Sequence, residues 1–351
     1  MIPREIVQPL LGWFYENRRD LPWRKEPSAY HVWLSEIMLQ QTRVEAVKGY
    51  YHRFLEALPE IEDLAACPET RLLKLWEGLG YYNRVRNMQK AARVVVEHYG
   101  GALPPDYEKL LGLPGIGSYT AGAVASIAFG ISRPAVDGNV LRVIARITEN
   151  EEDILRQSVK TKTERELAEI MPKDAPGDFN QSLMELGALI CIPNGMAKCG
   201  ECPLAELCLA RKHDRVMELP KKVEKKQRRL EKRTVLLIQD GEDFAIRKRE
   251  KKGLLAGMYE FPNLEGYKSQ EEVLEYVRGL SCQPVRIQPL SQAKHIFSHV
   301  EWEMEGYRVL IEPRDKRNAD GLLFVNKRET KGKYPIPAAF AAYRKYLEED
   351  I

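Results

Sequence analysis

Residues 113–122 read LPGIGSYTAG, and this stretch decides how the first part of the chain folds. Residues 109–113 look helical, and residues 118–128 are small, apolar and also compatible with a helix. Gly115 and Gly117 therefore lie in a tight turn between two helices, where glycine lets the backbone approach a ligand closely. The N–H groups that begin the second helix suit a phosphate, although the residues alone also fit a plain connection between helices.

An aspartate follows this element, in the stretch VDGNVLRVIARI at residues 136–147. Asp137 stands immediately before a clear helical pattern. Taken alone, Asp137 or Asn139 would cap that helix. In combination with a phosphate-binding turn, the acid could instead face a sugar undergoing cleavage, so both interpretations stay open.

Four of the chain's six cysteines crowd into one loop and predict a metal centre. They are Cys191, Cys199, Cys202 and Cys208, separated by seven, two and five residues. Disulfides are disfavoured, because nothing in the sequence indicates an oxidising compartment. Structural zinc sites usually have two short knuckles, whereas only the pair Cys199 and Cys202 forms one here. We therefore favour a cubane iron–sulfur cluster over zinc.

The composition is that of an ordinary soluble protein. The chain has 351 residues, which is comfortable for two domains, with 44% hydrophobic and 30% charged residues. The N-terminus carries charges early and is neither a signal peptide nor a membrane span, and no later stretch is apolar enough to cross a bilayer. We expect a cytoplasmic protein without membrane partners.

Positive charge is concentrated in residues 211–233. This stretch has eleven lysines and arginines against four acidic residues, a local charge of +7 in a chain whose formal net charge is +3. A solvated linker and a strap that contacts nucleic-acid phosphates both explain it. The run alone does not decide between them.

The periodicity of the sequence changes across this basic stretch. Residues before about 210 follow helical spacing, for example in 30–47, 88–96 and 140–147. After it come strand-like residues at 234–238, a turn signal at Asp240-Gly241, a helical pattern near 270–280 and further strands near 293–313. We expect a multi-domain protein with an all-α region and a smaller α+β domain.

Several of these stretches resemble the helix-hairpin-helix DNA glycosylases of the endonuclease III superfamily. LPGIGSYTAG, VDGN and the cysteine loop carry this resemblance, although the first gap between cysteines is one residue longer than usual. DLPWRKEPSAYHVWLSEIMLQQTRVEAV (20–47), WEGLGYYNRVRN (76–87) and FNQSLMELGALIC (179–191) narrow it to the MutY-type adenine DNA glycosylases. GLLAGMYEFP (253–262) and HIFSHVEWEM (295–304) resemble that family's nudix-like domain.

The resemblance implies a domain plan and an activity. The catalytic region is expected at 1–211, with a helix-hairpin-helix at about 109–128 and the iron–sulfur loop at 191–208. The basic linker follows at 212–232 and the nudix-like domain at 233–351. The implied activity is removal of adenine mispaired with 8-oxoguanine or guanine in duplex DNA, leaving an abasic site. A monomeric enzyme with a [4Fe-4S] cluster, held at the nucleoid by DNA, is expected.

Cleavage of an N-glycosidic bond needs two acids in different protonation states. Glu36 lies among apolar residues, so desolvation should raise its pKa and suit it to donate a proton. Without the surrounding motif it would read as a surface carboxylate on an amphipathic helix. The resemblance makes Glu36 the acid that protonates adenine, Asp137 the ionised partner of the sugar, and Asn139 the residue that orients Asp137.

Tyr119 is informative because glycosylases of this superfamily that also cut the strand carry a lysine at its position. A phenol cannot form the Schiff base through which such a lysine acts. We therefore expect a monofunctional glycosylase with little strand cleavage.

The resemblance also assigns contacts with DNA. The target base must leave the stack, and Gln41 and Tyr81 match the positions that fill the gap, although Tyr81 and Tyr82 could equally be core aromatics. Trp23 and Arg24 match positions near the adenine pocket, although Arg24 could belong to a structural ion pair. Gly115, Gly117 and Lys198, with Arg211 and Lys212 beside the cysteine loop, are expected to meet the DNA backbone.

Phe297-Ser298-His299 matches the loop that inspects 8-oxoguanine in the opposite strand. Standing alone, these residues would read as a turn at a strand end. Residues 253–290 show no glutamate-rich metal box of the nudix hydrolases. We therefore expect a recognition domain without hydrolase activity of its own.

Overall fold

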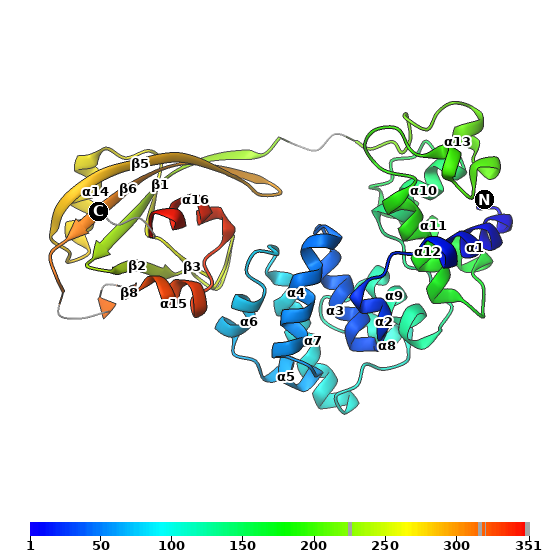
Figure 1. Cartoon of the computed structure of the whole chain (residues 1–351), viewed down its shortest axis with the longest axis horizontal. Coiled ribbons are helices and arrows are strands. Elements are labelled where there is room, and N and C mark those ends of the chain that lie inside the picture. Colours follow the sequence, from blue (N-terminus) through cyan, green and yellow to red (C-terminus); the bar gives the residue numbers. More distant parts are fainter. Residues whose placement is uncertain (224–226, 315–317, 320, 348–351) are drawn as a thin grey trace. The chain divides into compact units, whose positions relative to one another are not determined.

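The computed structural model describes residues 1–223, 227–314, 318–319 and 321–347 (Figure 1). Its contacts divide the chain into two compact units. The first comprises Met1–Ala66 with Arg86–Glu224, and the second comprises Cys67–Val85 with Lys225–Ile351. Residues 224–226, in the expected basic linker, lie outside the described residues. No described helix has the length and apolar character that crossing a membrane requires.

The described part of the chain before the basic stretch is helical, as expected. Its longer helices are α1 (Val7–Asn17), α3 (Ala29–Leu39), α4 (Val44–Ala57), α7 (Asn83–Tyr99), α9 (Ser118–Phe129), α10 (Gly138–Ile147), α11 (Gln157–Ile170) and α12 (Pro176–Leu189). Its shorter helices are α2 (Pro22–Lys25), α5 (Ile61–Ala66), α6 (Glu69–Leu75), α8 (Tyr107–Leu111) and α13 (Leu209–Lys212). The apolar repeat at 30–47 is not one helix, because a turn that contains Gln41 separates α3 from α4.

The turn predicted at 114–117 lies between α8 and α9. Gly115 adopts a φ of 77°, a left-handed conformation that favours glycine. A Cβ at this position would lie 2.6 Å from the Cβ of Asn87, so packing as well as backbone angle requires glycine. The helix-hairpin-helix at about 109–128 is therefore present, with its second helix ending at Phe129.

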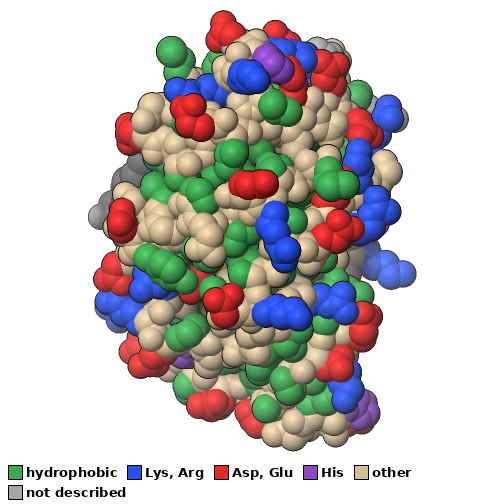
Figure 2. All heavy atoms as spheres, turned by 90° about the vertical axis from the view of Figure 1, so that its right-hand side faces the viewer, with side chains coloured by type: hydrophobic (Ala, Val, Ile, Leu, Met, Phe, Trp, Pro, Cys, Tyr) green, Lys and Arg blue, Asp and Glu red, His purple; other side chains and the backbone are tan. Residues whose placement is uncertain are grey.

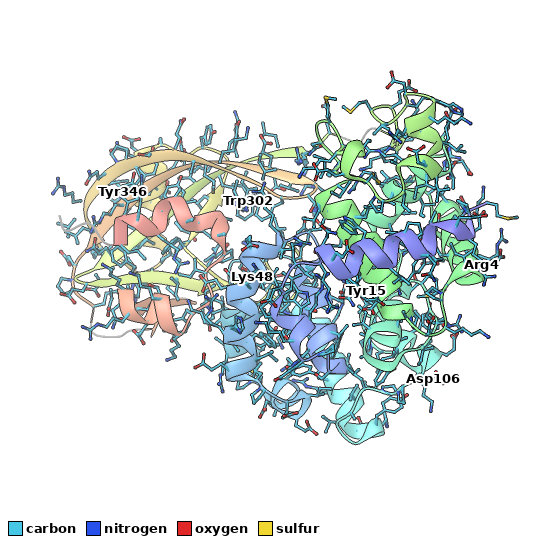
Figure 3. All side chains as sticks on the ribbon, turned by 45° about the vertical axis from the view of Figure 1, so that its right-hand side comes forward. Arg4, Tyr15, Lys48, Asp106, Trp302 and Tyr346 are labelled. Atoms are coloured by element: carbon cyan, nitrogen blue, oxygen red, sulfur yellow. The ribbon has the colours of Figure 1, made fainter. Side chains whose placement is uncertain are left out.

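The core of the first unit brings helices distant in sequence together. Residues of α1, α10, α11 and α12 share one buried apolar cluster. On α1, the hydroxyl of Tyr15 (labelled in Figure 3) donates to Asp178 Oδ2 on α12 at 3.0 Å. The same cluster packs α10, whose N-cap residue is Asp137, against α12.

The second unit is built on a mixed sheet with strand order β5-β6-β1-β2-β8-β7, and β3 and β4 pair with β2 and β1. The strands are β1 (Arg229–Asp240), β2 (Asp243–Lys248), β3 (Tyr259–Glu260), β4 (Asn263–Glu265), β5 (Pro284–Ile296), β6 (Val300–Ile311), β7 (Asn318–Ala319) and β8 (Leu322–Val325). β1 runs parallel to β6 and antiparallel to β2 across the predicted turn at Asp240-Gly241. Since β1 begins at Arg229, the last four residues of the expected linker are strand.

Helices cover both faces of this sheet (Figure 1). Successive side chains of β1 alternate between the faces. Leu236 packs in one cluster with α14 (Gln270–Gly279), and Val235 packs in another with Tyr343 of α16 (Ala341–Arg344). The fold class, an all-α helix-hairpin-helix region followed by a smaller α+β nudix-like domain, is confirmed.

The residues Cys67–Val85 belong to the second unit, which the sequence did not indicate. Lys74 Nζ donates to the carbonyls of Thr330 at 3.0 Å and Tyr334 at 3.2 Å. Arg344 Nη1 lies 2.6 Å from Glu77 Oε1. Within this unit, a segment that carries Tyr81 is thus bound to helices near the C-terminus by ion pairs and hydrogen bonds.

Candidate active site

The first unit contains a cleft of about 1010 Å³ lined by the residues expected to act on the base and sugar. Its lining includes Trp23, Arg24, Glu36, Gln41, Tyr119, Asp137 and Asn139. These residues come from four regions that are far apart in the sequence. The structure therefore brings the expected acids and the expected adenine-pocket residues to one cavity large enough for a nucleoside.

Glu36 lies on α3 and is 6% exposed, so its reading as a surface carboxylate is wrong. Burial raises the pKa of Glu36 to about 7, and the nearby charge of Asp137 acts in the same direction. The hydroxyl of Tyr119 donates a hydrogen bond to Glu36 Oε2, which opposes part of that rise. Burial also raises the pKa of Tyr119, so the phenol keeps its proton at neutral pH.

Asp137 is the N-cap residue of α10, as the capping interpretation expected. Its Oδ1 accepts from Val140 N at 2.7 Å, and its Oδ2 accepts from Asn139 Nδ2 at 2.9 Å. Burial raises the pKa of Asp137, while these N–H donors lower it because they favour the ionised form. The two interpretations of Asp137 are therefore compatible, because the carboxylate that caps α10 also lines the cleft.

Arg142 holds Asn139 in this arrangement, a contact that sequence reasoning missed. Its Nη2 donates to Asn139 Oδ1 at 2.9 Å and to the carbonyl of Gly187 at 2.8 Å. Arg142 is only 4% exposed. The available signal was an arginine one turn after Asn139 on a helix that is apolar apart from Asn139, Arg142 and Arg146, because a buried arginine needs several acceptors.

A second missed residue, Glu185, organises the wall of the cleft. Its Oε2 accepts from Arg24 Nη2 at 3.0 Å and from Arg19 Nη2 at 2.9 Å. Burial alone would raise the pKa of Glu185, but the hydrogen bonds from the two arginines outweigh it and lower the pKa to about 2. Arg24 thus belongs to an ion pair, as one interpretation expected, and it also lines the cleft, while its contact with adenine stays a prediction. Trp23 is buried and its ring meets that of Tyr51 edge-on at 5.5 Å.

The two residues expected to fill the gap in DNA both have unusual backbone angles. Gln41 has a φ of 58° and Tyr81 a φ of 47°, in the left-handed region that side chains other than glycine rarely adopt. Tyr81 is 47% exposed, so it is not a core aromatic, whereas its neighbour Tyr82 is buried. Each of the two residues lies in its own unit.

The four cysteines of the loop line one small cavity with apolar neighbours, including Val143 and Leu204. Within the described residues, no three metal-binding side chains converge on a single ion. A cubane cluster does not require convergence, because each thiolate binds a different iron. Burial raises the pKa of the Cys202 thiol to about 11, so a thiolate there needs a cation beside it. An all-sulfur donor set suits a soft iron–sulfur centre, and the loop fits such a group.

Basic side chains beside this loop reach solvent. Lys198, Arg211 and Lys212 are exposed, although Arg211 Nη1 also pairs with Glu206 at 2.7 Å. On the face shown in Figure 2, cationic and anionic side chains are interspersed. Gly115 and Gly117 are exposed as well. The expected phosphate contacts are therefore accessible, and they remain predictions.

Phe297-Ser298-His299 forms the connection between β5 and β6, as the turn interpretation expected. Phe297 N donates to Val300 O at 2.8 Å, and its ring packs edge-on against Trp302 at 4.9 Å. Ser298 and His299 are exposed. The loop thus has an aromatic anchor and presents two polar side chains to solvent.

Comparisons with known proteins agree with this geometry. The HhH-GPD superfamily of base excision DNA repair proteins matches residues 34–173, and the NUDIX domain matches residues 233–347. An adenine DNA glycosylase of Mus musculus is 34% identical over 361 residues, which cover 86% of this chain and 70% of the mouse protein. The chain belongs to the adenine DNA glycosylase family.

Solved structures related to this family member share its helical region. A thermostable thymine-DNA glycosylase is 32% identical with a TM-score of 0.54, covering 60% of this chain and 97% of that one. Endonuclease III in a trapped covalent intermediate with DNA is 26% identical with a TM-score of 0.52, covering 61% and 99%. Since one fold carries different base specificities, the residues of the cleft have to decide which base is removed.

Proposed function

We propose that this member of the adenine DNA glycosylase family hydrolyses the N-glycosidic bond of adenine mispaired with 8-oxoguanine, or with guanine, in duplex DNA. The observation that carries the proposal is the pairing of a buried, proton-binding Glu36 with a hydrogen-bonded Asp137 carboxylate in one cleft. Two carboxyl groups in different protonation states are what glycoside hydrolysis requires.

In this mechanism Glu36 gives its proton to a ring nitrogen of adenine while the bond from that base to the sugar breaks. The bonding electron pair leaves with the base, and positive charge grows on the sugar. Asp137, held by Val140 and Asn139, stabilises that charge. Water then adds to the sugar carbon and releases a proton, leaving an abasic site.

The same site supports monofunctional chemistry. Tyr119 is committed to Glu36 by a hydrogen bond, and a phenol forms no imine with the sugar. Arg19 and Arg24 do not offer a nucleophile either, because their guanidinium groups are paired with Glu185 and stay protonated at neutral pH.

Lys160 also lines the cleft, and its Nζ lies 3.7 Å from Glu164 Oε1. Because the position of Tyr119 offers no amine, strand cleavage by pure protein should be weak.

Recognition of 8-oxoguanine is assigned to the loop Phe297-Ser298-His299 together with Tyr81. A [4Fe-4S] cluster would be held by Cys191, Cys199, Cys202 and Cys208. It would order the loop that carries Lys198 beside the DNA backbone. No catalytic step is assigned to it.

Single-turnover assays test the proposal. Short duplexes would carry adenine opposite 8-oxoguanine, guanine, cytosine or thymine, and products would be examined with and without alkali. We expect adenine release opposite 8-oxoguanine and guanine, with strand breaks chiefly after alkali. Efficient strand cleavage trapped by borohydride would contradict the monofunctional part.

Asp137→Asn separates the catalytic role of Asp137 from its capping role. Asparagine caps a helix as well as aspartate does, so α10 should keep its stability. Only the negative charge is lost. Base release should collapse while DNA binding survives, and an unchanged rate would show that the mechanism is wrong.

A further inference from the structure

The turn that carries Tyr81 is held in a strained shape. Tyr81 has a φ of 47°, and the preceding Gly80 has a φ of 70°. Left-handed geometry at a bulky residue persists only when its surroundings impose it, and it occurs most often at functional sites. We therefore expect the cause of this conformation in the side chains that contact the turn.

Arg84, on the first turn of α7, contacts this turn on two sides. Its Nη2 donates to the carbonyl oxygen of Leu79 at 3.1 Å and to that of Gly80 at 3.2 Å. Its guanidinium carbon lies 5.6 Å from the ring centroid of Tyr81 and 5.5 Å from that of Trp76. Guanidinium groups favour such stacking on aromatic rings. One side chain thus fixes both the backbone before Tyr81 and the ring of Tyr81.

The far end of Tyr81 meets the loop between β5 and β6. The Tyr81 hydroxyl and Ser298 Oγ lie 2.8 Å apart, and both residues belong to the second unit. Arg228 Nε donates to the carbonyl of Phe297 at 3.2 Å, which holds the same loop from the side of β1. Tyr81 and Ser298 are therefore in direct hydrogen-bond contact within this unit.

We propose that Arg84 is a positioning residue that holds Tyr81 against Ser298, so that the two side chains form one preassembled reader of the base opposite the target adenine. This inference rests on the proposed function and deepens it. Preassembly reduces the ordering cost of binding. Loss of Arg84 should then reduce the preference for 8-oxoguanine over guanine.

The test is a double-mutant cycle on the full chain, with single-turnover rates and dissociation constants for adenine opposite 8-oxoguanine and opposite guanine. Arg84→Met keeps the aliphatic stem but loses the donors and the stacking. We expect both Arg84→Met and Tyr81→Ala to lower the preference for 8-oxoguanine about tenfold, and the double variant to match Tyr81→Ala alone. Additive losses would overturn the inference, because Arg84 would then act independently of Tyr81.

Two further variants guard against a merely structural explanation. Arg84→Lys should keep the fold and the positive charge but lose the planar guanidinium that lies over the rings of Tyr81 and Trp76, so it should show the same loss of preference to a smaller degree. Arg93→Met removes an exposed arginine farther along α7 and should leave the preference unchanged. If Arg84→Lys only lowers stability and leaves the preference intact, the inference fails. A wild type that releases adenine from neither duplex would instead overturn the proposed function itself.

Discussion

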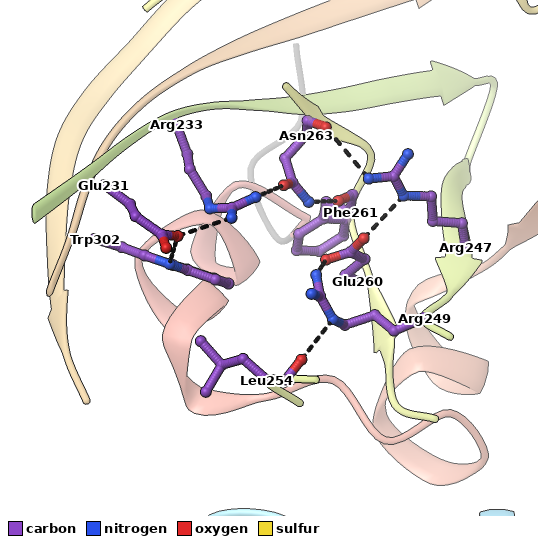
Figure 4. Close-up of polar contacts among 9 residues, drawn as sticks. All are labelled: Glu231, Arg233, Arg247, Arg249, Leu254, Glu260, Phe261, Asn263 and Trp302. Atoms are coloured by element: carbon purple, nitrogen blue, oxygen red, sulfur yellow. Dashed lines mark hydrogen bonds and ion pairs between the residues drawn. The ribbon is translucent and has the colours of Figure 1, made fainter. Parts of the chain in front are cut away.

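Two buried glutamates, one in each unit, have opposite surroundings. Glu36 is 6% exposed and has the neutral phenol of Tyr119 as a hydrogen-bond partner. Glu260 is 2% exposed and accepts from Arg247 Nε at 2.8 Å and from Arg249 Nη1 (Figure 4). A neutral partner leaves the negative charge uncompensated, so the first carboxyl binds a proton. Two guanidinium groups compensate the second, which serves the structure.

The different surroundings of the two glutamates follow from their hydrogen-bond partners and not from the unit in which each lies. Glu185 is in the same unit as Glu36 and is as deeply buried as Glu260, yet hydrogen bonds from Arg19 and Arg24 overcome that burial and lower its pKa to about 2. Between Glu36 and Glu185, proton donation at neutral pH is therefore available from Glu36.

The network around Glu260 supports the loop that is expected to read 8-oxoguanine. Arg233 bridges Asn263 and Glu231, and Glu231 accepts from Trp302 Nε1 at 2.9 Å (Figure 4). Trp302 in turn packs against Phe297. These charged groups of the second unit thus connect strands beside the loop that is expected to read 8-oxoguanine.

The largest expected effect is on the rate of adenine release, which should depend on Glu36 and not on Glu260. Glu36→Gln removes the proton donor while keeping the shape and the bond to Tyr119. Loss of a general acid should lower the single-turnover rate of adenine release by about 10²–10⁴-fold, with duplex affinity retained. Glu260→Gln, measured in parallel, should leave the chemical rate nearly unchanged. Equal rates for both variants would remove the basis of the comparison.

Stability should show the reverse pattern. Glu260→Gln leaves two arginines without their buried counter-ion, which should lower the free energy of unfolding of the second unit by about 2–4 kcal/mol. The expected value is in the lower part of the range for buried pairs because Arg247 is partly exposed. Urea titration followed by tryptophan fluorescence would measure it. A loss no greater than that of Glu36→Gln would contradict the structural role of Glu260.

Dependence of stability on pH sharpens the comparison further. Burial raises the pKa of Glu36 from 4.5 to about 7, so between these values the folded protein holds a proton that the unfolded chain has released. This stabilisation is complete below the lower value and is lost as pH rises through the upper one. Between pH 5 and pH 8 the wild type should lose about 2 kcal/mol more than Glu36→Gln does. Parallel pH profiles for the two proteins would contradict the raised pKa.

The rate of the wild type should also depend on pH. Since Glu36 acts as an acid, base release should decline above pH 7, by about tenfold for each pH unit. Asp137 must be ionised, so the rate should also fall at low pH, at a value above the ordinary range of an aspartate because burial raises its pKa. Single-turnover rates from pH 5 to pH 9 would show both limbs. A rate that rises steadily with pH would contradict the assignment of Glu36.

Sequence reasoning reached the fold because its signals are local, whereas the roles of Glu36 and Asp137 came from the family resemblance and stay predictions. The glycines of the hairpin, the helix after Asp137 and the apolar neighbours of Glu36 are all visible within a few residues. It missed Glu185 as the partner of Arg19 and Arg24, which lie more than 150 residues away in the chain. No local pattern reports such a pairing.

That residues 67–85 belong to the second unit was also missed, because contacts between residues far apart in the chain leave no local pattern. The helical pattern of residues 67–85 resembles that of the preceding residues, and their membership of the second unit shows in contacts with distant residues, such as those that Lys74 makes with Thr330 and Glu77 makes with Arg344.

Tyr119 was singled out from the sequence because glycosylases that also cut the strand carry a lysine at its position. Its hydrogen bond to Glu36 became visible only when α3 and α9 were placed together.

The most direct test is a titration of the Glu36 carboxyl itself. Infrared difference spectra of the wild type minus Glu36→Gln, recorded across pH, isolate the protonated carboxyl band of this one residue. A band that disappears with a midpoint near pH 7 is the predicted result. A midpoint near the ordinary value of 4.5 would show that Glu36 is ionised at neutral pH, and it would contradict the proposal that this acid protonates the leaving base.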